Sequence, residues 1–246
     1  MLITTNEPTD RADWHQAIVD EARMSGKVSE LIRSAARRQI INEAALKNAI
    51  QPTEIELQVA ADNFRRVNQL TTIAATSNWL AANFISIEDF EQILRDRLIT
   101  AKLAHHLFAD RVEQYFWQNS HEYSAATLYE IVLTDRYVAM ELFYAIAEGD
   151  LNFTDVAQQY ITDPELNRRG GYLGTLKRRQ LHPAISAAVF AATPPQTIAP
   201  VTTDLGIHLI RVVEIVEPQL DETLSEQILM ELFDLWLAQQ LAGEDR

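Results

Sequence analysis

The sequence holds one compact group of side chains that could bind a metal ion, at His105, His106, Asp110 and Glu113. His106, Asp110 and Glu113 follow an i, i+4, i+7 spacing, so on a single helix they share one face. Imidazole and carboxylate groups are metal ligands, but no further helix offers an obvious partner ligand. We therefore interpret the group as a solvated polar face and expect neither a metal ion nor a cofactor.

The sequence lacks the motifs of several other enzyme classes. It has no G-x-S-x-G elbow for a nucleophilic serine, and neither a P-loop nor a G-x-G-x-x-G fingerprint for phosphates. Cysteine is absent, which excludes a cysteine nucleophile, cysteine-ligated metals and disulfide scaffolds. Gly171-Tyr-Leu-Gly174 is a lone G-x-x-G and favours a tight turn over nucleotide binding.

Basic residues cluster at Arg168-Arg169 and Lys177-Arg178-Arg179, although the formal net charge of the chain is −14. Two interpretations stay open for this cluster: a local site for acidic groups on a peptide, or a solvated loop rim. An acidic chain repels phosphate backbones and anionic lipid surfaces, so we expect no nucleic-acid partner. The sequence has no run of about 20 apolar residues, so we expect no membrane insertion. The first 16 residues lack the basic start and apolar stretch of a signal peptide, so we expect a cytoplasmic location.

Helical spacing dominates the first half of the chain and predicts four or five helices over residues 10–120. Two starts are marked, by a capping box of Thr53 with Glu56 and by Ser86 as an N-cap before acidic residues. The apolar positions at this spacing are Leu31, Ile32, Ala35, Ala36, Ile40, Ile55, Val59, Phe64, Val67, Phe90, Ile93, Leu94, Leu98, Leu103 and Leu107.

The pattern changes near residue 127, and five of the seven glycines lie between Gly149 and Gly206. The sequence predicts a strand at 127–134, helices at 139–148, 153–160 and 183–192, a turn-rich segment at 161–182, and a closing hairpin at 201–216. Strands and helices mixed in this way indicate an α+β domain.

A last helix is predicted over residues 222–240. Its apolar stripe must be buried, and the simplest partner is the N-terminal group of helices. The stripe consists of Leu224, Ile228, Leu229, Leu232, Leu235 and Trp236. We therefore expect a helical domain at 1–122, an inserted α+β domain at 123–217, and a C-terminal helix at 218–246 that packs on the first domain.

The order of motifs between Gly149 and His208 is specific. It comprises Gly149, Phe153 and Ala157, a Gly-Gly-x-Leu-Gly signature at 170–174, a helix ending in Phe190, then Pro200-Val201, Thr203 and Gly206-Ile-His208. Residues 127–217 thereby resemble the parvulin family of peptidyl-prolyl cis–trans isomerases. The resemblance implies a small antiparallel sheet flanked by helices, no cofactor, and clients that are proline-containing polypeptides.

The helical segments carry a looser resemblance. Residues 27–120 are similar to the chaperone domain that flanks the parvulin module in SurA-like bacterial foldases, where Ser86-IEDF-x-x-x-LR matches a recurrent phrase. Those proteins also return a C-terminal helix to the N-terminal domain.

The parvulin resemblance implies a catalytic pocket. Leu181, Ile185 and Phe190 would hold the proline ring, and Asp163, Thr203 and His208 match polar positions of the family. Glu130 stands where the family has a first-strand histidine, and it could orient His208 by accepting its ring proton. Such an enzyme needs no covalent step, because it only has to bind the twisted amide better than either planar form.

Plain structural roles remain open for the same residues: Asp163 can shape the turn before Pro164, His208 can be a core residue, and the apolar set can be core. Tyr172 and Pro195 also depart from the family pattern. The short connection Thr134-Asp135-Arg136 lacks a basic loop, which predicts no phosphate requirement. Two hypotheses follow: an active isomerase with a chaperone-like helical domain, or a module that has lost most catalysis and acts as a peptide-binding holdase.

Overall fold

The computed structural model describes residues 11–244, which fall into two compact units. The helical unit contains the residues up to Val112 together with those from Glu226 onward, and the sheet unit contains Glu113–Ser225. Among the described residues, no helix is both long and apolar enough to cross a membrane.

The helical unit begins with α1 (Arg11–Met24), α2 (Val28–Lys47), α3 (Glu54–Val67), α4 (Ile73–Ala82) and α5 (Ile87–Phe108). A 3₁₀ turn (Ala109–Arg111) follows, and α6 (Val112–Asn119) leads into the sheet unit. Described residues up to 119 therefore form six α-helices, where the sequence predicts four or five. The difference arises at α4, which Thr72 caps, and at the 3₁₀ turn that separates α5 from α6.

Both predicted helix starts are confirmed. The backbone N–H of Glu56 donates to Thr53 Oγ1 over 3.3 Å, and Thr53 N–H donates back to Glu56 Oε2 over 2.7 Å. Ser86 and Asp89 exchange the same pair of bonds, each 3.0 Å long. These reciprocal bonds satisfy backbone donors that the first helical turn leaves without partners.

Helical spacing proves only a partial guide to burial in this unit. Ile40, Phe90, Leu94 and Leu103 are buried as expected. Several other positions of the same pattern instead face solvent with large exposed fractions: Leu31 55%, Ile32 64%, Ile55 77%, Val59 52% and Val67 76%. The helical unit thus leaves several large apolar side chains exposed to solvent, outside its core.

The last helix, α11 (Glu222–Glu244), buries Ile228, Leu229, Phe233 and Leu237. Arg37 of α2 forms an ion pair with Asp234 of α11, with 2.9 Å between Nη2 and Oδ1. The predicted stripe is wrong at Leu235, which is 53% exposed, because Phe233 and Leu237 occupy the buried side of the helix.

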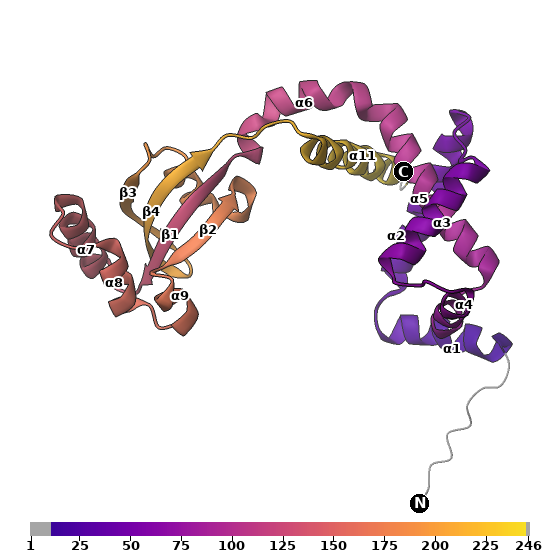
Figure 1. Ribbon diagram of the computed structural model, residues 1–246, viewed down its shortest axis with the longest axis horizontal. Coiled ribbons are helices and arrows are strands. Elements are labelled where there is room, and N and C mark those ends of the chain that lie inside the picture. Colours follow the sequence, from indigo (N-terminus) through magenta and orange to yellow (C-terminus); the bar gives the residue numbers. More distant parts are fainter. Residues whose placement is uncertain (1–10, 245–246) are drawn as a thin grey trace, which may run out of the picture. The chain divides into compact units, whose positions relative to one another are not determined.

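The sheet unit is built on one antiparallel sheet with strand order β2-β1-β4-β3 (Figure 1). The strands are β1 (Ala125–Leu133), β2 (Tyr172–Lys177), β3 (Gln196–Thr203) and β4 (Gly206–Val216). The helices are α7 (Arg136–Glu148), α8 (Phe153–Tyr160), α9 (Pro164–Arg168) and α10 (Pro183–Val189). The predicted α+β class is confirmed, but β2 lies inside the segment predicted to be turn-rich, because its glycine and short length hide the strand pattern.

Each face of the sheet has its own apolar cluster. One face packs against α7 and α8 through Ile131, Leu133, Ala139, Leu142, Phe153, Val156, Ala157, Ile207 and Leu209. The opposite face packs against α10 through Ala126, Leu128, Ile185, Val189, Ile198, Ile210 and Val212. Because side chains alternate along a strand, Glu130 and His208 belong to the α10 face.

Candidate functional site

Three polar side chains from three strands form a hydrogen-bonded chain centred on His208. Its Nδ1 lies 2.7 Å from Oε1 of Glu130, and its Nε2 lies 2.7 Å from Oγ1 of Thr203. The backbone N–H of Leu205 also donates to Thr203 Oγ1 over 3.1 Å. We call Glu130, His208 and Thr203 the polar chain.

Strand register brings the polar chain together. On the β1–β4 ladder, Glu130 pairs with Ile210 and Val132 pairs with His208, so the two polar residues are diagonal neighbours on one face. A register shift at Thr127/Leu128 sets this alignment. Thr203 ends β3 opposite Gly206, two residues before His208, and therefore projects beside the imidazole.

The hydrogen bonds of the polar chain have a defined donor and acceptor at each step, and its central imidazole is buried. His208 is only 4% exposed and the Glu130 side chain 19% exposed. An ionised carboxylate can only accept, so Nδ1–H of His208 donates to Glu130. In neutral His208, Nε2 then accepts from the Thr203 hydroxyl; in the imidazolium, Nε2–H donates to Thr203 and releases the hydroxyl proton for another acceptor.

The Gly170-Gly171 turn fixes the backbone of Glu130. Glu130 N–H donates to the Gly171 carbonyl over 2.9 Å, and a Cβ at Gly171 would lie only 2.7 Å from the Glu130 carbonyl oxygen. Gly171 also has φ +83°, a conformation that other residues rarely adopt. The signature glycine is therefore required by a close backbone approach at the site.

Asp163 is placed differently from the other polar candidates. It is the exposed N-cap of α9, and its Oδ1 accepts from the backbone N–H groups of Glu165 and Leu166 over 3.0 and 2.7 Å. Among the described residues, no hydrogen bond joins its side chain to the polar chain. Of the four polar candidates, the structure thus brings Glu130, Thr203 and His208 into contact.

The three apolar candidates lie on the same sheet face as the polar chain. Ile185 is a buried member of the α10 cluster, whereas Leu181 and Phe190 are half-buried and pack against that cluster. The guanidinium of Arg178 lies 4.0 Å from the centroid of the Phe190 ring. Leu181 therefore presents more accessible surface to a ligand than Ile185 does, and one face of Phe190 is already covered.

The two parts of the basic cluster differ in their distance from the polar chain. Arg168-Arg169 directly precede the turn whose Gly171 carbonyl accepts from Glu130 N–H, whereas Lys177 is far from His208. Lys177 pairs with Ala125 and His208 pairs with Val132, which places them seven residues, or roughly 23 Å, apart along β1. Three arginines of the cluster stack over aromatic rings: Arg169 over Tyr172, Arg178 over Phe190 and Arg179 over Tyr123. Sequence spacing offers no signal for the contacts of Arg178 and Arg179, whose aromatic partners are 12 and 56 residues away, whereas Tyr172 is only three residues from Arg169.

The candidate metal ligands do not share one helix face, as their spacing suggested. Helix α5 ends at Phe108, so His106 lies on α5, Asp110 in the 3₁₀ turn and Glu113 on α6. Over residues 11–244, no group of three or more His, Asp or Glu side chains is arranged to hold a metal ion.

Comparison with known proteins finds a family match inside the sheet unit. Residues 136–214 match the Rotamase family model, described as a PPIC-type PPIASE domain. The foldase protein PrsA of Halalkalibacterium halodurans is 21% identical over 211 residues, covering 82% of this chain and 62% of the relative. PrsA of Caldanaerobacter subterraneus is 19% identical over 205 residues, covering 83% of this chain and 63% of the relative. The chain thus spans less than two thirds of the length of these curated relatives.

The fold is also shared with a solved structure. The crystal structure of peptidylprolyl isomerase PrsA from Bacillus cereus has a TM-score of 0.51 and 15% identity, covering 100% of this chain and 88% of that one. At this identity the likeness concerns the fold.

Proposed function

We propose that the chain accelerates cis–trans isomerisation of Xaa-Pro bonds in unfolded or extended polypeptide clients, because residues 136–214 match the PPIC-type, or parvulin-type, peptidyl-prolyl isomerase model. The observation that carries the proposal is the polar chain of Glu130, His208 and Thr203 on an otherwise apolar sheet face. Rotation about an amide has a barrier of about 20 kcal/mol, and prolyl bonds populate both isomers, so such a catalyst has a real equilibrium to accelerate.

The proposed mechanism uses the two parts of this face together. Leu181, Ile185 and Phe190 hold the proline ring and keep water from the planar amide, whose resonance favours a polar surrounding. When the bond twists, nitrogen and carbonyl become separate acceptors that need donors. An imidazolium at His208, paired with Glu130, donates to Thr203 and leaves the hydroxyl proton of Thr203 for the twisted amide.

We further propose that the reaction does not require a phosphorylated client. The connection between β1 and α7 is short, and its Asp135 is the N-cap of α7, where it accepts from the backbone N–H of Tyr137 over 2.7 Å. A basic loop for a phosphate is therefore missing from this connection. A phosphopeptide preferred tenfold or more over its unphosphorylated twin would overturn this part of the proposal.

NMR exchange on a short Xaa-Pro peptide tests the isomerase directly. His208→Ala and Thr203→Val should each lower kcat/KM by tenfold or more, whereas Thr203→Ser should retain most of it. Asp163 needs two variants, because Asp163→Asn keeps the N-cap acceptor and Asp163→Ala removes it. If Asp163 acts on the amide, both variants lose activity; acceleration that survives every one of these changes would refute the site.

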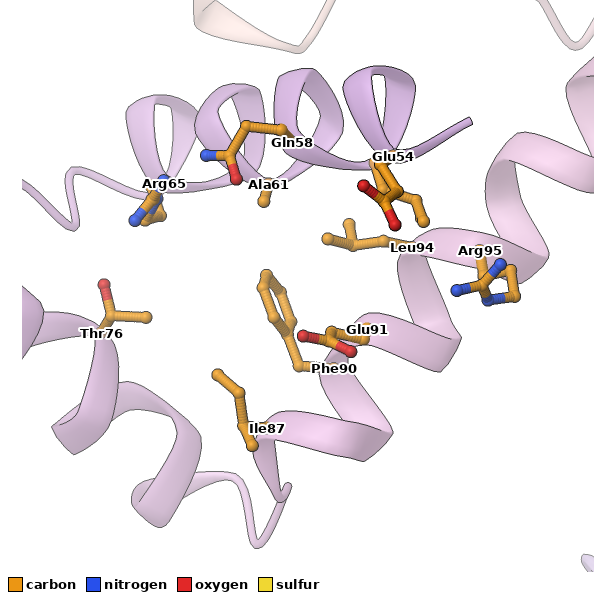
Figure 2. A pocket seen from close by; sticks show the side chains of 11 residues that line it. Glu54, Gln58, Ala61, Arg65, Thr76, Ile87, Phe90, Glu91, Leu94 and Arg95 are labelled. Atoms are coloured by element: carbon orange, nitrogen blue, oxygen red, sulfur yellow. The ribbon is translucent and has the colours of Figure 1, made fainter. Parts of the chain in front are cut away.

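A second candidate function, a holdase, is favoured by a groove in the helical unit between α3, α4 and α5 (Figure 2). The groove has a volume of about 450 Å³. Phe90 and Leu94 form an apolar floor, and Glu54, Arg65 and Glu91 stand at its rim (Figure 2). Such a groove suits an apolar side chain of an extended client, with polar groups left for its backbone.

Aggregation of an unfolded client measures the holdase separately from isomerisation. Ile87→Asn, which changes a 52% exposed lining residue, should weaken suppression of aggregation. Ile73→Asn is the matched control, because Ile73 is 85% exposed on α4 but does not line the groove. Equal suppression by both variants would contradict a role for the groove.

The cytoplasmic location expected from residues 1–16 stays a prediction.

A further inference from the structure

Two exposed apolar side chains adjoin the polar chain. Val132, on β1, is 45% exposed and pairs directly with His208. Leu205, at the tip of the turn between β3 and β4, is 79% exposed, and its backbone N–H donates to the Thr203 hydroxyl. Single exposed apolar residues are common, but these two adjoin the buried His208 and its hydroxyl partner Thr203.

Gly206 shows how closely Val132 approaches this turn. A Cβ at Gly206 would lie 2.9 Å from Val132 Cγ1 and 2.9 Å from the Leu133 carbonyl oxygen. Gly206 also has φ +138°, so a side chain is disfavoured at this position. The Val132 side chain therefore lies against the turn that carries Leu205, and the two residues flank one end of the sheet face.

The features of this face follow one another along β4. Ile210 and Val212 belong to the apolar cluster beneath α10. His208 comes next, with its hydrogen bonds to Glu130 and Thr203. Gly206 is last, with Val132 on one side and the turn residue Leu205 on the other. From α10 outward along β4, the apolar cluster comes first, then His208 with Val132 directly opposite it on β1, and last the turn that carries Leu205.

We propose that Val132 and Leu205 form the binding surface for the side chain that precedes proline, and that this surface selects an apolar residue there. The inference rests on the proposed isomerase function. With the proline ring on the α10 side and the twisted carbonyl at His208 and Thr203, the preceding residue extends toward Val132, opposite His208, and toward Leu205 in the adjoining turn. Burying an apolar side chain there is favourable, whereas a carboxylate would lie near Glu130 and be repelled.

Exchange NMR on a peptide series Ala-Xaa-Pro-Ala, with Leu, Ala, Gln, Glu or Lys as Xaa, tests this surface. We expect kcat/KM for Leu to exceed that for Ala by about 3- to 10-fold, with Glu the poorest substrate. Val132→Thr combined with Leu205→Ser should bring the Leu:Ala ratio toward one. Val132→Thr keeps the shape and β-branching of valine, which protects the strand.

Leu151→Ser is the matched control, because Leu151 is a 42% exposed apolar residue between α7 and α8, the helices that pack on the opposite face. It should leave the Leu:Ala ratio unchanged. A flat profile across Xaa, or a ratio that survives the double change, would overturn the proposed surface while leaving the isomerase intact.

If no peptide is accelerated, the isomerase proposal fails and the surface is judged by binding alone. In that case the methyl NMR signals of Val132 and Leu205 should still shift on titration with the Leu-Pro peptide more than with the Glu-Pro peptide. Equal shifts with both peptides would overturn the surface as well.

Discussion

Glu130 and His208 are 78 residues apart in the sequence, yet Oε1 of the carboxylate lies 2.7 Å from Nδ1 of the buried imidazole. This contact determines which ring nitrogen faces Thr203. Glu130 stands where the parvulin pattern has a first-strand histidine, and its ionised carboxylate can only accept a hydrogen bond.

Glu130 is therefore expected to contribute to both stability and catalysis. Glu130→Ala leaves a buried N–H without a partner and should lower the free energy of unfolding by about 1–3 kcal/mol. Glu130→Gln retains an acceptor and should recover most of that loss. Urea unfolding measures the stability, and ¹⁵N shifts of the imidazole report the tautomer; unchanged ring shifts in Glu130→Ala would contradict a positioning role.

Gly171 and Gly174 form a matched pair that separates steric contact from backbone strain. Both have positive φ, but only Gly171 has an atom close to its missing Cβ, the Glu130 carbonyl oxygen at 2.7 Å. Gly174→Ala should cost about 1–2 kcal/mol through the left-handed conformation alone. Gly171→Ala should cost clearly more and should also lower isomerase activity. Equal unfolding free energies for the two variants would show that the close approach has no consequence.

Glu56 links α3 to α5, because both of its carboxylate oxygens bind Nζ of Lys102. This bond, with those from Thr53, lowers the pKa of Glu56 from 4.5 to about 2. A lowered pKa means that the stabilisation is fully present above about pH 4.5 and is lost as the pH falls toward 2. Lys102→Met should therefore raise the midpoint of acid unfolding.

A second variant, Glu54→Gln, is the control for the acid unfolding of Lys102→Met. Glu54→Gln removes a neighbouring carboxylate of the same helix that forms no ion pair with Lys102. It should leave the acid midpoint near that of the unaltered protein. Because Glu54→Gln changes the net charge by +1 and Lys102→Met by −1, shifts of similar size in opposite directions would mean that the effect comes from net charge.

Helix α11 should be needed for the helical unit. Phe233 is fully buried, so Phe233→Ala should cost about 3–5 kcal/mol, whereas Leu235→Ala, at a 53% exposed position, should change stability by less than about 0.5 kcal/mol. Truncation after Glu217 should expose the partners of Phe233 and cause aggregation, detected by light scattering. A truncated chain that stays monomeric and equally stable would contradict this role of α11.

Local features of the fold could be predicted from the sequence because they depend on contacts within a few residues. The capping boxes at Thr53 and Ser86, the start of α8 at Phe153 and the turn before Gly206 all follow from groups two or three positions apart. Strand β2 was missed, since it gains its definition from pairing with β1 and has little pattern of its own.

The candidate site likewise has features that the sequence predicts and features that depend on the tertiary structure. The motif order identified Thr203 and His208, and it indicated that Glu130 stands at the position of a family histidine. It did not show that Oδ1 of Asp163 caps α9, or that Arg178 covers Phe190, because both depend on how the chain folds around these residues.

The amino-acid sequence by itself determined the class of the domain, its helix starts and the chemical types available at the site. Tertiary structure alone decided which of them meet. The register shift at Thr127/Leu128 puts Glu130 and His208 on one face, and a displacement by one residue would turn Glu130 to the opposite face. Helical spacing likewise marks an apolar side of a helix but does not say what covers it, which is why Ile55 and Val67 remain exposed while Phe90 is buried.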